Sequence, residues 1–364
     1  MIVHLLPGGM EHHVPEMIKF FAVNAAKLDV DAGAQLFVVF GADIADKSCY
    51  KDICLNGGQL VFYPNRCVDS HFLRMMTKAD SLIIHSVFFP HIWRNVFLHP
   101  GLWRRTAIVN WGAGFQRRDS LRGRVLALLR RIMLPRLGAI STLVPGEFEE
   151  IQRCYGVCAN YVRAFYTTLP AELECEPMDG RGTCRVLLGN SAWESNNHLE
   201  VLDWLHRYEA EDIEIVCPLA YPVGSSHAKD VMEVGHRLFG AKFRPLCQMM
   251  PRTQYTQLLN TIDVFVLNTS NQQALFAVYH LLAKGRKVYL RGESPTYQML
   301  VQLGIVVHKV SDIAAHDLAG FRKLDTEISL ENARKARMYF SIEAALDGWH
   351  TLIDRIRPSG RESR

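Results

Sequence analysis

Short apolar runs alternate with segments of helical periodicity along most of the chain. Residues 1–6 (MIVHLL) are followed by residues 14–28, in which apolar positions recur every three or four residues. The apolar runs are rich in Val, Ile and Phe on both faces, which is typical of parallel strands covered by helices on both sides. The runs that we interpret as strands are 1–6, 34–41, 59–64, 81–86, 106–112, 139–146, 185–190, 213–222, 241–246, 263–270, 286–292 and 305–310.

This pattern is interrupted between residues 167 and 184. The segment TTLPAELECEPMDGRGTC holds two prolines and two glycines, which are typical of a linker. We therefore predict two doubly wound, Rossmann-like α/β domains that face a cleft, 1–166 and 185–330, joined by the linker 167–184. Residues 331–364 form a separate C-terminal part, and the chain is predicted to be helical from 329 to 356.

The composition is that of a globular protein. The chain has 364 residues, of which 49% are hydrophobic and 21% charged. Its nine cysteines form no CxxC pair and its histidines no HExxH, so we expect reduced thiols and no structural metal. The start of the chain is not typical of a signal peptide, and no apolar run reaches the ~18 residues of a membrane-spanning helix.

Positive charge is concentrated between residues 104 and 136. This segment holds nine arginines and one aspartate, a net charge of +8, so the rest of a chain with net charge +4 carries −4. Residues 120–138 place apolar side chains on one helical stripe, which suits an anionic membrane or a lipid diphosphate. The alternative is a surface helix whose stripe faces its own core; nucleic acid is less favoured, because aromatic residues do not accompany the arginines. The predicted membrane contacts are Arg117, Arg118, Arg122, Arg124, Arg130 and Arg131.

Two polar loops follow predicted strands in the second half of the chain. Open parallel sheets bind ligands beyond the carboxyl ends of their strands, and a following helix N-terminus attracts anions. We therefore predict a nucleotide diphosphate site held by neutral donors, although Ser195 or Asn196 could serve only as a helix cap. Neither GxGxxG nor GxxxxGK[ST] is present. The loop residues are Gly189, Asn190, Ser191, Ser195 and Asn196 in the first loop, Thr269, Ser270, Asn271, Gln272 and Gln273 in the second, and Tyr221 between them.

Several segments, in order and spacing, resemble the 4-acetamido-4,6-dideoxygalactose transferases of enterobacterial common antigen synthesis, also called lipid II N-acetylfucosaminyltransferases. The segments are HHVPEMIKFF near the start, NWGAG at 110–114, VLLGNSAWESNNH at 186–198, CPLAYP at 217–222, SNQQALFAVYHLLAKGRKVYL at 270–290 and RGESPTYQ at 291–298.

The resemblance implies a metal-independent GT-B glycosyltransferase without a cofactor. It implies a nucleotide-sugar donor, with dTDP as the expected nucleotide, bound in the second domain. It further implies an acceptor saccharide on undecaprenyl diphosphate, and a cytoplasmic protein that lies peripherally on the inner face of the cell membrane. The last helix of such folds returns to the first domain, which gives residues 331–364 a role.

The resemblance also assigns roles to single residues. His198, Glu293 and the polar loops match donor-site positions, and His12 and His13 match a histidine pair that could accept the acceptor's proton, with Asp119 as a further candidate base. Asn110, Trp111 and Gly112 could line the acceptor side, with Trp111 stacking on a sugar ring; a buried core tryptophan is the alternative. The chain departs from the family pattern at Gly114 and Asn197, where acidic residues are usual. Apart from the resemblance, Arg252, Lys284 or Arg286 could add a cation at the diphosphate; the alternative for each is a solvated surface side chain.

Two other interpretations stay open at this point. A soluble enzyme of related fold that cleaves or epimerises a nucleotide sugar would have no use for the basic helix. A non-catalytic nucleotide-binding protein would be consistent with Gly114 in place of an acid.

Overall fold

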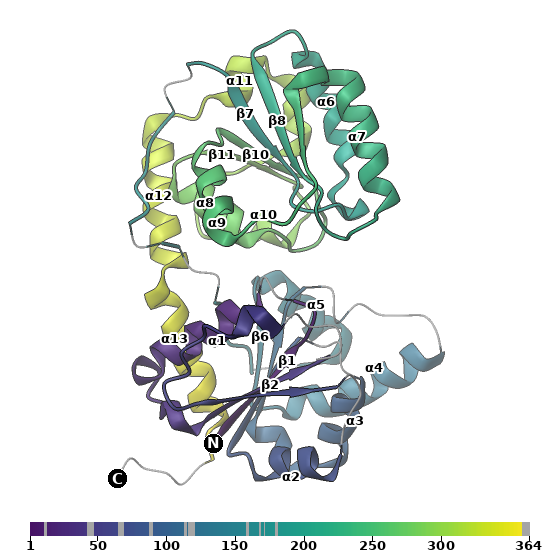
Figure 1. Cartoon of the computed structure of the whole chain (residues 1–364), viewed down its shortest axis with the longest axis vertical. Helices are drawn as coiled ribbons and strands as arrows, with labels where there is room; N and C mark the ends of the chain where they lie inside the picture. Colours follow the sequence, from purple (N-terminus) through teal and green to yellow (C-terminus); the bar gives the residue numbers. More distant parts are fainter. Residues whose placement is uncertain are drawn as a thin grey trace. The chain divides into compact units, whose positions relative to one another are not determined.

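The computed structural model describes residues 1–10, 13–41, 47–64, 69–86, 90–112, 115, 121–157, 160–166, 169–170, 172–178 and 181–358. For residues 90, 121 and 122 it describes the backbone alone. The chain divides into two compact units, which are described separately below (Figure 1). Unit 1 comprises Met1–Tyr166 and Ile342–Arg364, and unit 2 comprises Thr167–Ser341.

Unit 1 contains a six-stranded parallel sheet in the order β3-β2-β1-β4-β5-β6. One face of the sheet packs on α2, α3 and α5 through a cluster of buried side chains that includes Phe72, Trp93 and Ile151. The other face is covered by α1 and α13, which lie together on one side of the unit (Figure 1). The elements are β1 (Ile2–Pro7), α1 (Val14–Asn24), β2 (Gln35–Phe40), β3 (Gln59–Tyr63), α2 (Ser70–Lys78), β4 (Ser81–His85), α3 (Pro90–Leu98), β5 (Thr106–Asn110), α4 (Leu121–Met133), β6 (Ala139–Thr142) and α5 (Pro145–Tyr155).

Unit 2 repeats this plan with a parallel sheet in the order β12-β11-β10-β7-β8-β9. Apolar side chains of α6, α7 and α11 pack on one face, and α9 carries eight buried residues out of nine. The elements of unit 2 are β7 (Cys184–Leu188), α6 (His198–Leu205), β8 (Ile213–Pro218), α7 (Ser226–Phe239), β9 (Phe243–Leu246), α8 (Arg252–Asn260), β10 (Val264–Leu267), α9 (Leu275–Ala283), β11 (Lys287–Leu290), α10 (Pro295–Gln302), β12 (His308–Lys309), α11 (Leu318–Arg322) and α12 (Thr326–Phe340). The last helix of the chain, α13 (Ile342–Ile356), belongs to unit 1.

The helical tail is two helices rather than one. α12 ends at Phe340, whose ring stacks on Tyr279 of α9 with centroids 3.6 Å apart, so this helix belongs to unit 2. Ser341 then adopts an extended conformation, with φ −70° and ψ 170°. α13 packs on unit 1, where Trp349 Nε1 donates to the Phe165 carbonyl oxygen at 3.0 Å. The unit boundary therefore follows Ser341, whereas residues 331–364 had been expected to form one C-terminal part.

Candidate functional site

The two predicted polar loops of unit 2 meet where its chain order reverses. β7 lies between β10 and β8, so the connections that follow β7 and β10 run to opposite sides of the sheet. Crevices at such switch points, beyond the carboxyl ends of the strands, are the usual ligand sites of open α/β sheets. The loop that follows Leu188 and the loop that follows Leu267 are therefore neighbours at the edge where a ligand is expected.

Gly189 allows the first loop to turn sharply. Its φ is +68°, in the left-handed region that favours glycine, and its N–H donates to the Val266 carbonyl oxygen on β10 at 2.9 Å. A Cβ at this position would lie 2.5 Å from Nε2 of His198, a contact that real Cβ atoms do not make. Glycine is therefore required both by the backbone and by the buried imidazole beneath it.

Asn196 joins the two loops. Its Oδ1 accepts from the N–H of Asn190 at 3.2 Å, and its Nδ2 donates to Ser191 Oγ at 3.2 Å and to Gln273 Oε1 at 3.1 Å. Gln273 Nε2 in turn donates to Ser195 Oγ at 3.0 Å. Asn196 is fully buried, so these bonds are shielded from water. The alternative of a simple helix cap is wrong for Asn196 and Ser195, because the N-cap of α6 is Asn197.

Asn197 and Asn268 make a second connection between the loops. Asn197, with φ +49°, donates from Nδ2 to the Asn268 carbonyl oxygen at 2.7 Å. The buried Asn268 donates from its own Nδ2 to Glu200 Oε2 at 2.7 Å and accepts from Arg291 at 3.5 Å. Asn197, where the family pattern usually has an acid, therefore ties β10 to α6.

Both helices that begin at the switch point lack a side-chain cap. The N-cap residues are Asn197 for α6 and Ala274 for α9, and neither makes a side-chain cap hydrogen bond. The first N–H groups of a helix have no partner within the helix and carry the positive end of its dipole. These two N-termini therefore provide backbone donors and positive potential suited to an anion.

His198 lies directly under the first loop. Its side chain is fully buried, and its Nδ1 is hydrogen-bonded to Nε2 of His227 at 3.1 Å. Burial, assisted by His227, lowers the pKa of His198 to about 3, so the ring is neutral at physiological pH. Its Nε2 and the Oδ1 of Asn190 are buried and have no partner among the described residues. Both atoms lie at the loop where the ligand is expected.

Tyr221 and Trp193 form an exposed aromatic pair beside the first loop. Their rings are in edge-to-face contact with centroids 5.9 Å apart, and 46% and 48% of the two residues is exposed. The Tyr221 carbonyl oxygen accepts from the N–H of Ala192, which connects the turn after β8 to the loop after β7. Tyr221, a predicted site residue, is thus at the rim of the site. Trp193, which the sequence did not indicate as a site residue, lies beside it.

The other predicted donor residues are close to the same edge. Thr269 is buried, and its Oγ1 accepts from the N–H of Asn271 at 3.2 Å. Ser270 is exposed, and Gln272 is partly buried. Glu293 follows β11 with 83% of its side chain exposed, and Arg291 approaches it to 3.6 Å.

The cations around the site are not all those expected. Lys284 and Arg286 precede β11, at the opposite edge of the sheet, and both form ion pairs with Glu176, so their assignment as donor cations is wrong. The Arg252 guanidinium lies over the ring of Phe276, in the first turn of α9, at 4.6 Å. Arg291 follows β11 at the ligand edge. The hydrophobic pattern predicts this strand, but it does not show whether an arginine at its end borders a site or is only solvated.

In unit 1, Tyr166 lies between the predicted base and the predicted acceptor residues. Its ring centroid is 6.3 Å from that of His13 and 5.9 Å from that of Trp111. His13 precedes α1, and Trp111 follows β5, so both lie beyond the carboxyl ends of strands. The Nε1 of Trp111 and the Oδ1 of Asn110 are buried and have no partner within the described residues. Asn110 Nδ2 donates to the carbonyl oxygen of Gly112, whose φ is +111°.

A buried pair of histidines lies next to Trp111. His4 Nδ1 and His85 Nε2 are 3.1 Å apart on the sheet face that α1 and α13 cover, and the His85 ring lies 6.1 Å from that of Trp111. Burial lowers the pKa of His4 to about 3 and that of His85 well below its ordinary value. Both rings are therefore neutral, and they form a buried polar pair next to Trp111.

Glu147 was not singled out from the sequence. It lies in the first turn of α5, just beyond the carboxyl end of β6, and its Oε2 is buried with no partner in the described part of unit 1. Burial, with a contribution from Glu150, raises the pKa of Glu147 to about 8. An acidic residue in the first turn of a helix is common, because it interacts favourably with the helix dipole. The sequence therefore contained no signal that Glu147 differs from other acidic residues at such positions.

Part of the arginine-rich segment forms α4, and three members of its predicted apolar stripe are exposed. Val125, Leu128 and Ile132 are 53%, 60% and 39% exposed, so these side chains do not face the core of their own unit, whereas Leu129 is partly buried. Arg124 and Arg131 are exposed as well. Arg130 differs: it is buried, its guanidinium lies 4.8 Å from the ring centroid of Phe115, and it donates to the Tyr155 hydroxyl at 3.2 Å. A membrane contact at Arg130 is therefore not compatible with the structure.

Some predicted residues lie outside the described part of the chain. These are His12, Asp119, Arg117, Arg118 and the side chain of Arg122. Among the described residues, no cluster of three or more His, Cys, Asp or Glu side chains could hold a metal ion. No described helix is both long enough and apolar enough to span a bilayer.

A comparison with known families decides the class of protein. Residues 1–355 match the family described as 4-alpha-L-fucosyltransferase, glycosyl transferase group 56. The chain belongs to this family of glycosyltransferases. The match spans both units and all of the loops discussed above.

Solved structures confirm the predicted GT-B architecture. A glycosyltransferase from Rickettsia africae ESF-5 superposes with a TM-score of 0.71 at 12% identity, covering 99% of each chain. HepE of Anabaena, in complex with UDP and glucose, superposes with a TM-score of 0.66 at 9% identity, covering 98% of each chain. The structure described as trehalose-6-phosphate from E. coli bound with UDP-2-fluoro glucose has a TM-score of 0.68 at 9% identity and covers 99% of this chain and 100% of its own. Likeness at these identities shows the fold alone.

A glycosyltransferase must stabilise the departing group of its donor and orient the acceptor hydroxyl. Unit 2 has helix N-termini, neutral amides and an aromatic rim beyond the carboxyl ends of its strands. Unit 1 has His13, Trp111 and Glu147 at the carboxyl edge of its own sheet. The residues that sequence analysis missed (Trp193, Asn268, Arg291, Tyr166 and Glu147) are brought to these edges by strand ends and by contacts between separate loops.

Proposed function

We propose that this glycosyltransferase moves a deoxyamino sugar from a dTDP-linked donor to a saccharide on undecaprenyl diphosphate, in the synthesis of a bacterial surface polysaccharide. The main support is the hydrogen bond between Asn196 and Gln273. It joins the two polar loops that precede α6 and α9, whose N-termini have no side-chain cap. Such a site suits a diphosphate held without a metal. The resemblance of its loops to the dideoxygalactose transferases supports the choice of sugar and of nucleotide.

The donor is assigned to unit 2. The first-turn N–H groups of α9 face the developing negative charge of the leaving diphosphate, and Arg291 and Arg252 add cationic charge nearby. The exposed Trp193–Tyr221 pair offers an aromatic surface for the nucleobase. The complexes of HepE with UDP and glucose and of the E. coli protein with UDP-2-fluoro glucose support a nucleotide-sugar donor in this fold.

The acceptor is assigned to unit 1. Trp111 presents a ring on which a sugar can stack, and the unpartnered Oδ1 of Asn110 can accept from a sugar hydroxyl. In the transfer, the acceptor hydroxyl oxygen forms a bond to C1 of the donor sugar while the bond from C1 to the diphosphate oxygen breaks. The hydroxyl proton passes to a base, for which His13 and the neighbouring His12 are the proposed residues, with Asp119 as a further candidate.

The exposed stripe of α4 is the proposed membrane contact. Val125, Leu128 and Ile132 would enter the interfacial region, while Arg124 and Arg131 would face anionic headgroups, each arginine contributing about 1 kcal/mol. Arg117, Arg118 and Arg122 complete the proposed surface, and Arg130 is left out because it packs inside unit 1. The protein would then act at the cytoplasmic face of the inner membrane, where it meets its lipid-linked acceptor.

A thermal-shift panel tests the donor assignment. We expect dTDP and dTDP-sugars to raise the melting temperature of the full chain more than UDP, GDP and their sugars do, without added metal. The panel is repeated with Gln273→Ala, which removes the bond between the loops, and with Gln257→Ala, an exposed glutamine of α8, as the matched control. Equal ligand-induced rises in melting temperature for wild type and Gln273→Ala would contradict the assignment of the donor to these loops.

The base and the membrane surface are tested separately. His12→Ala and His13→Ala are assayed with the donor selected by the panel; full turnover in both variants rejects the histidine base. For the membrane, Arg124→Glu/Arg131→Glu and Leu128→Ser/Ile132→Ser are compared with wild type in flotation on phosphatidylglycerol vesicles. We expect both double variants to float less well than wild type. Unchanged flotation of both would contradict a membrane contact through α4.

A further inference from the structure

Glu147 of unit 1 forms neither a side-chain hydrogen bond nor an ion pair with any described residue. It lies in the first turn of α5, directly beyond the carboxyl end of β6, and its Oε2 is buried. The residue as a whole is partly exposed, which leaves it accessible to a ligand. Two other acidic residues near this edge are engaged: Glu16 pairs with Lys19 at 3.0 Å, and Asp69 accepts from the N–H of Phe72 at 2.7 Å. Glu147 is therefore an acidic group whose place in the fold is not explained by a structural contact.

The surroundings of Glu147 favour the protonated form of its carboxyl group. A buried carboxylate without a partner is costly, and the nearby Glu150 adds a like charge. Burial, with this contribution from Glu150, raises the pKa of Glu147 to about 8. Tyr161 is close enough to be influenced by the charges of Glu147, Glu149 and Arg163, and burial raises its own pKa. At neutral pH Glu147 is therefore a carboxylic acid, with a proton that it can donate in a hydrogen bond.

The position of Glu147 separates it from the proposed base. Strands β1, β4, β5 and β6 are successive neighbours in the sheet; His13 follows β1, and Glu147 follows β6. Neighbouring strands lie about 4.8 Å apart, so the ends of β1 and β6 are roughly 14 Å apart. Between them, Asn110 ends β5 and is paired in register with Thr142 of β6. Glu147 is therefore beside the proposed acceptor residues, but it is placed for a part of the acceptor other than the reacting hydroxyl.

The membrane side of unit 1 indicates which part of the acceptor this is. α4, which carries the proposed membrane contact, packs beside α5: Arg131 Nε donates to the Cys154 carbonyl oxygen, and Arg130 donates to the Tyr155 hydroxyl, both at 3.2 Å. In a lipid-linked saccharide the diphosphate lies between the sugar and the lipid. An acceptor whose reacting sugar is near His13 and whose lipid is near α4 therefore brings its diphosphate to the edge formed by β6 and α5.

The N-terminus of α5 is suited to such a diphosphate. The helix has 11 residues, and its N-cap residue, Val144, makes no side-chain cap hydrogen bond. The first N–H groups of a helix and the positive end of its dipole attract anions. Glu147 lies in this first turn. If ionised, it would repel a diphosphate bound there, whereas in its protonated form it can donate to one.

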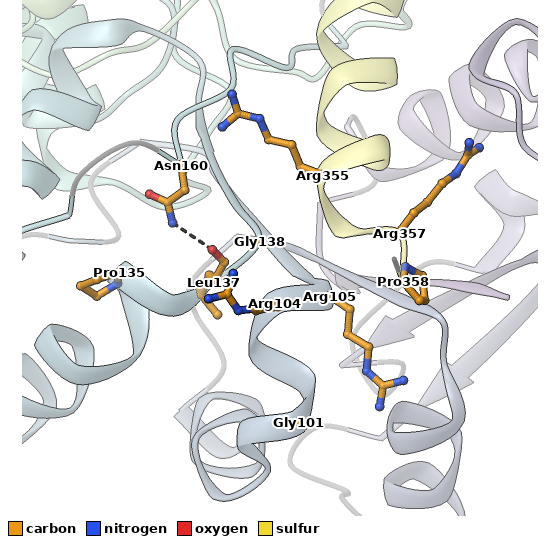
Figure 2. A pocket seen from close by; sticks show the side chains of 10 residues that line it. All are labelled: Gly101, Arg104, Arg105, Pro135, Leu137, Gly138, Asn160, Arg355, Arg357 and Pro358. Carbon is orange, nitrogen blue, oxygen red and sulfur yellow. Dashed lines mark hydrogen bonds between the residues drawn. The ribbon is translucent and has the colours of Figure 1, made fainter. Parts of the chain in front are cut away.

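A cavity lined by arginines lies elsewhere in unit 1. It has a volume of about 460 Å³, and its lining includes Arg104 and Arg105 (Figure 2). Both arginines immediately precede β5, so the cavity is at the amino edge of the sheet, whereas Glu147 and Asn110 are at the carboxyl edge. A diphosphate on the acceptor side is therefore out of reach of these two guanidinium groups.

We propose that Glu147 recognises the diphosphate of the acceptor in its protonated form, by donating a hydrogen bond to a phosphate oxygen at the N-terminus of α5. The proposal rests on the lipid diphosphate acceptor proposed above. Because an ionised Glu147 repels the diphosphate, diphosphate binding and proton binding strengthen each other. Glu147 is thus a specificity-determining residue that favours an acceptor carried on a diphosphate over a neutral glycoside, and acceptor binding is lost as Glu147 ionises.

The test measures the binding of a soluble acceptor analogue to the full chain by isothermal titration calorimetry at constant ionic strength. The probe is N-acetylglucosaminyl diphosphate esterified with decanol, whose diphosphate has no ionisable proton between pH 6.5 and pH 9.5. Any pH dependence therefore comes from the protein. The dissociation constant of the wild type should be nearly constant below pH 7.5 and should rise by about tenfold per pH unit above pH 8, because only the protonated form of Glu147 donates.

Two substitutions of Glu147 isolate its contribution. Glu147→Gln keeps an N–H donor and does not titrate, so its dissociation constant should stay within about twofold of the wild-type value at pH 6.5 across the whole range. Glu147→Leu has no donor, so its dissociation constant should be about tenfold higher at pH 6.5 and independent of pH. The matched control is Glu149→Gln, exposed on the same helix, which should follow the wild-type profile.

A second ligand identifies the group that Glu147 contacts. Decyl N-acetylglucosaminide has the same sugar and tail without the diphosphate; it should bind more weakly than the probe and without pH dependence. A loss of its binding with pH as steep as that of the probe overturns the proposal. Probe binding that does not change with pH, or that is equal in wild type and Glu147→Leu, overturns the role of Glu147 and leaves the proposed acceptor standing. If the wild type does not bind the probe, the proposed lipid diphosphate acceptor is rejected together with the role of Glu147.

Discussion

The side chain of Asn196 donates a hydrogen bond from Nδ2 to Oε1 of Gln273, 3.1 Å away and 77 residues later in the chain. This bond joins the loop after β7 to the loop after β10, the two strands that flank the topological switch point of unit 2. Because Asn196 also accepts from the N–H of Asn190, one buried amide sets the shape of the first loop and its distance from the second. The proposed donor site is therefore held in place before any ligand binds.

Asn196→Ala and Gln273→Ala should each lower kcat/KM for the nucleotide sugar by about tenfold, which corresponds to about 1.4 kcal/mol. The double variant should lose less than the sum of the single losses, because both substitutions break the same bond. Steady-state kinetics at subsaturating donor give these values, with Gln257→Ala as the unaffected control. Strict additivity would show that the two amides act independently.

Gly189→Ala should destabilise the protein by about 3 kcal/mol, since it combines left-handed strain with a clash against His198. Gly224→Ala is the matched control: its φ is +76°, but a Cβ there meets no atom within 4 Å, so it should cost only about 1 kcal/mol. Urea unfolding followed by circular dichroism measures both. A Gly189→Ala cost no larger than that of Gly224→Ala would mean that the His198 ring can move aside.

Glu147→Gln should change how stability depends on pH. The pKa of Glu147 is about 8 in the folded chain and 4.5 as its ordinary value, so the wild type loses stability as the pH rises from 4.5 to 8. Glutamine does not titrate, so the variant should equal the wild type near pH 4.5 and exceed it above pH 8, by on the order of a few kcal/mol. Melting temperatures across this range test the prediction. Glu149→Gln, exposed on the same helix, should follow the wild-type profile.

Arg130→Met should lower the free energy of unfolding by about 2 kcal/mol. It removes the cation–π contact with Phe115 and the hydrogen bond to Tyr155 while filling much of the same volume. The exposed neighbour Arg131→Met should cost less than about 1 kcal/mol, and it should weaken flotation on anionic vesicles, which Arg130→Met should not. A larger loss of flotation in Arg130→Met would place this side chain on the surface after all.

The strands were predictable because buried parallel strands carry a local signal. Val, Ile and Phe on both faces identify runs such as 34–41 and 263–270, and both overlap strands of the observed sheets. The polar loops after β7 and β10 were predictable for the same reason, since a strand end and a following helix locate a loop without any tertiary information. What these residues do within the loops was not predictable. Asn196 is a connector between loops rather than a cap, because its partner Gln273 is distant in sequence.

Two features could not be predicted from local sequence patterns: the break in the C-terminal helical segment and the environments of individual basic residues. Residues 329–356 have helical periodicity throughout, with neither proline nor glycine at Ser341, so nothing local marks the break between α12 and α13. Arg130 and Arg131 are adjacent and chemically identical, yet one is buried among rings and the other is exposed. Lys284 and Arg286 likewise lie at the wrong edge of the sheet for the donor, since strand direction decides which end of a strand borders a site.

Local patterns along the chain were sufficient to predict the two-part α/β organisation, the positions of the strands and the polar loops at their ends, because the hydrophobic burial of each element depends on residues close together in the chain. Which polar side chains meet and which arginines are buried became evident from the three-dimensional fold. Those outcomes depend on strand order and on contacts between residues far apart in the chain, which no local pattern encodes.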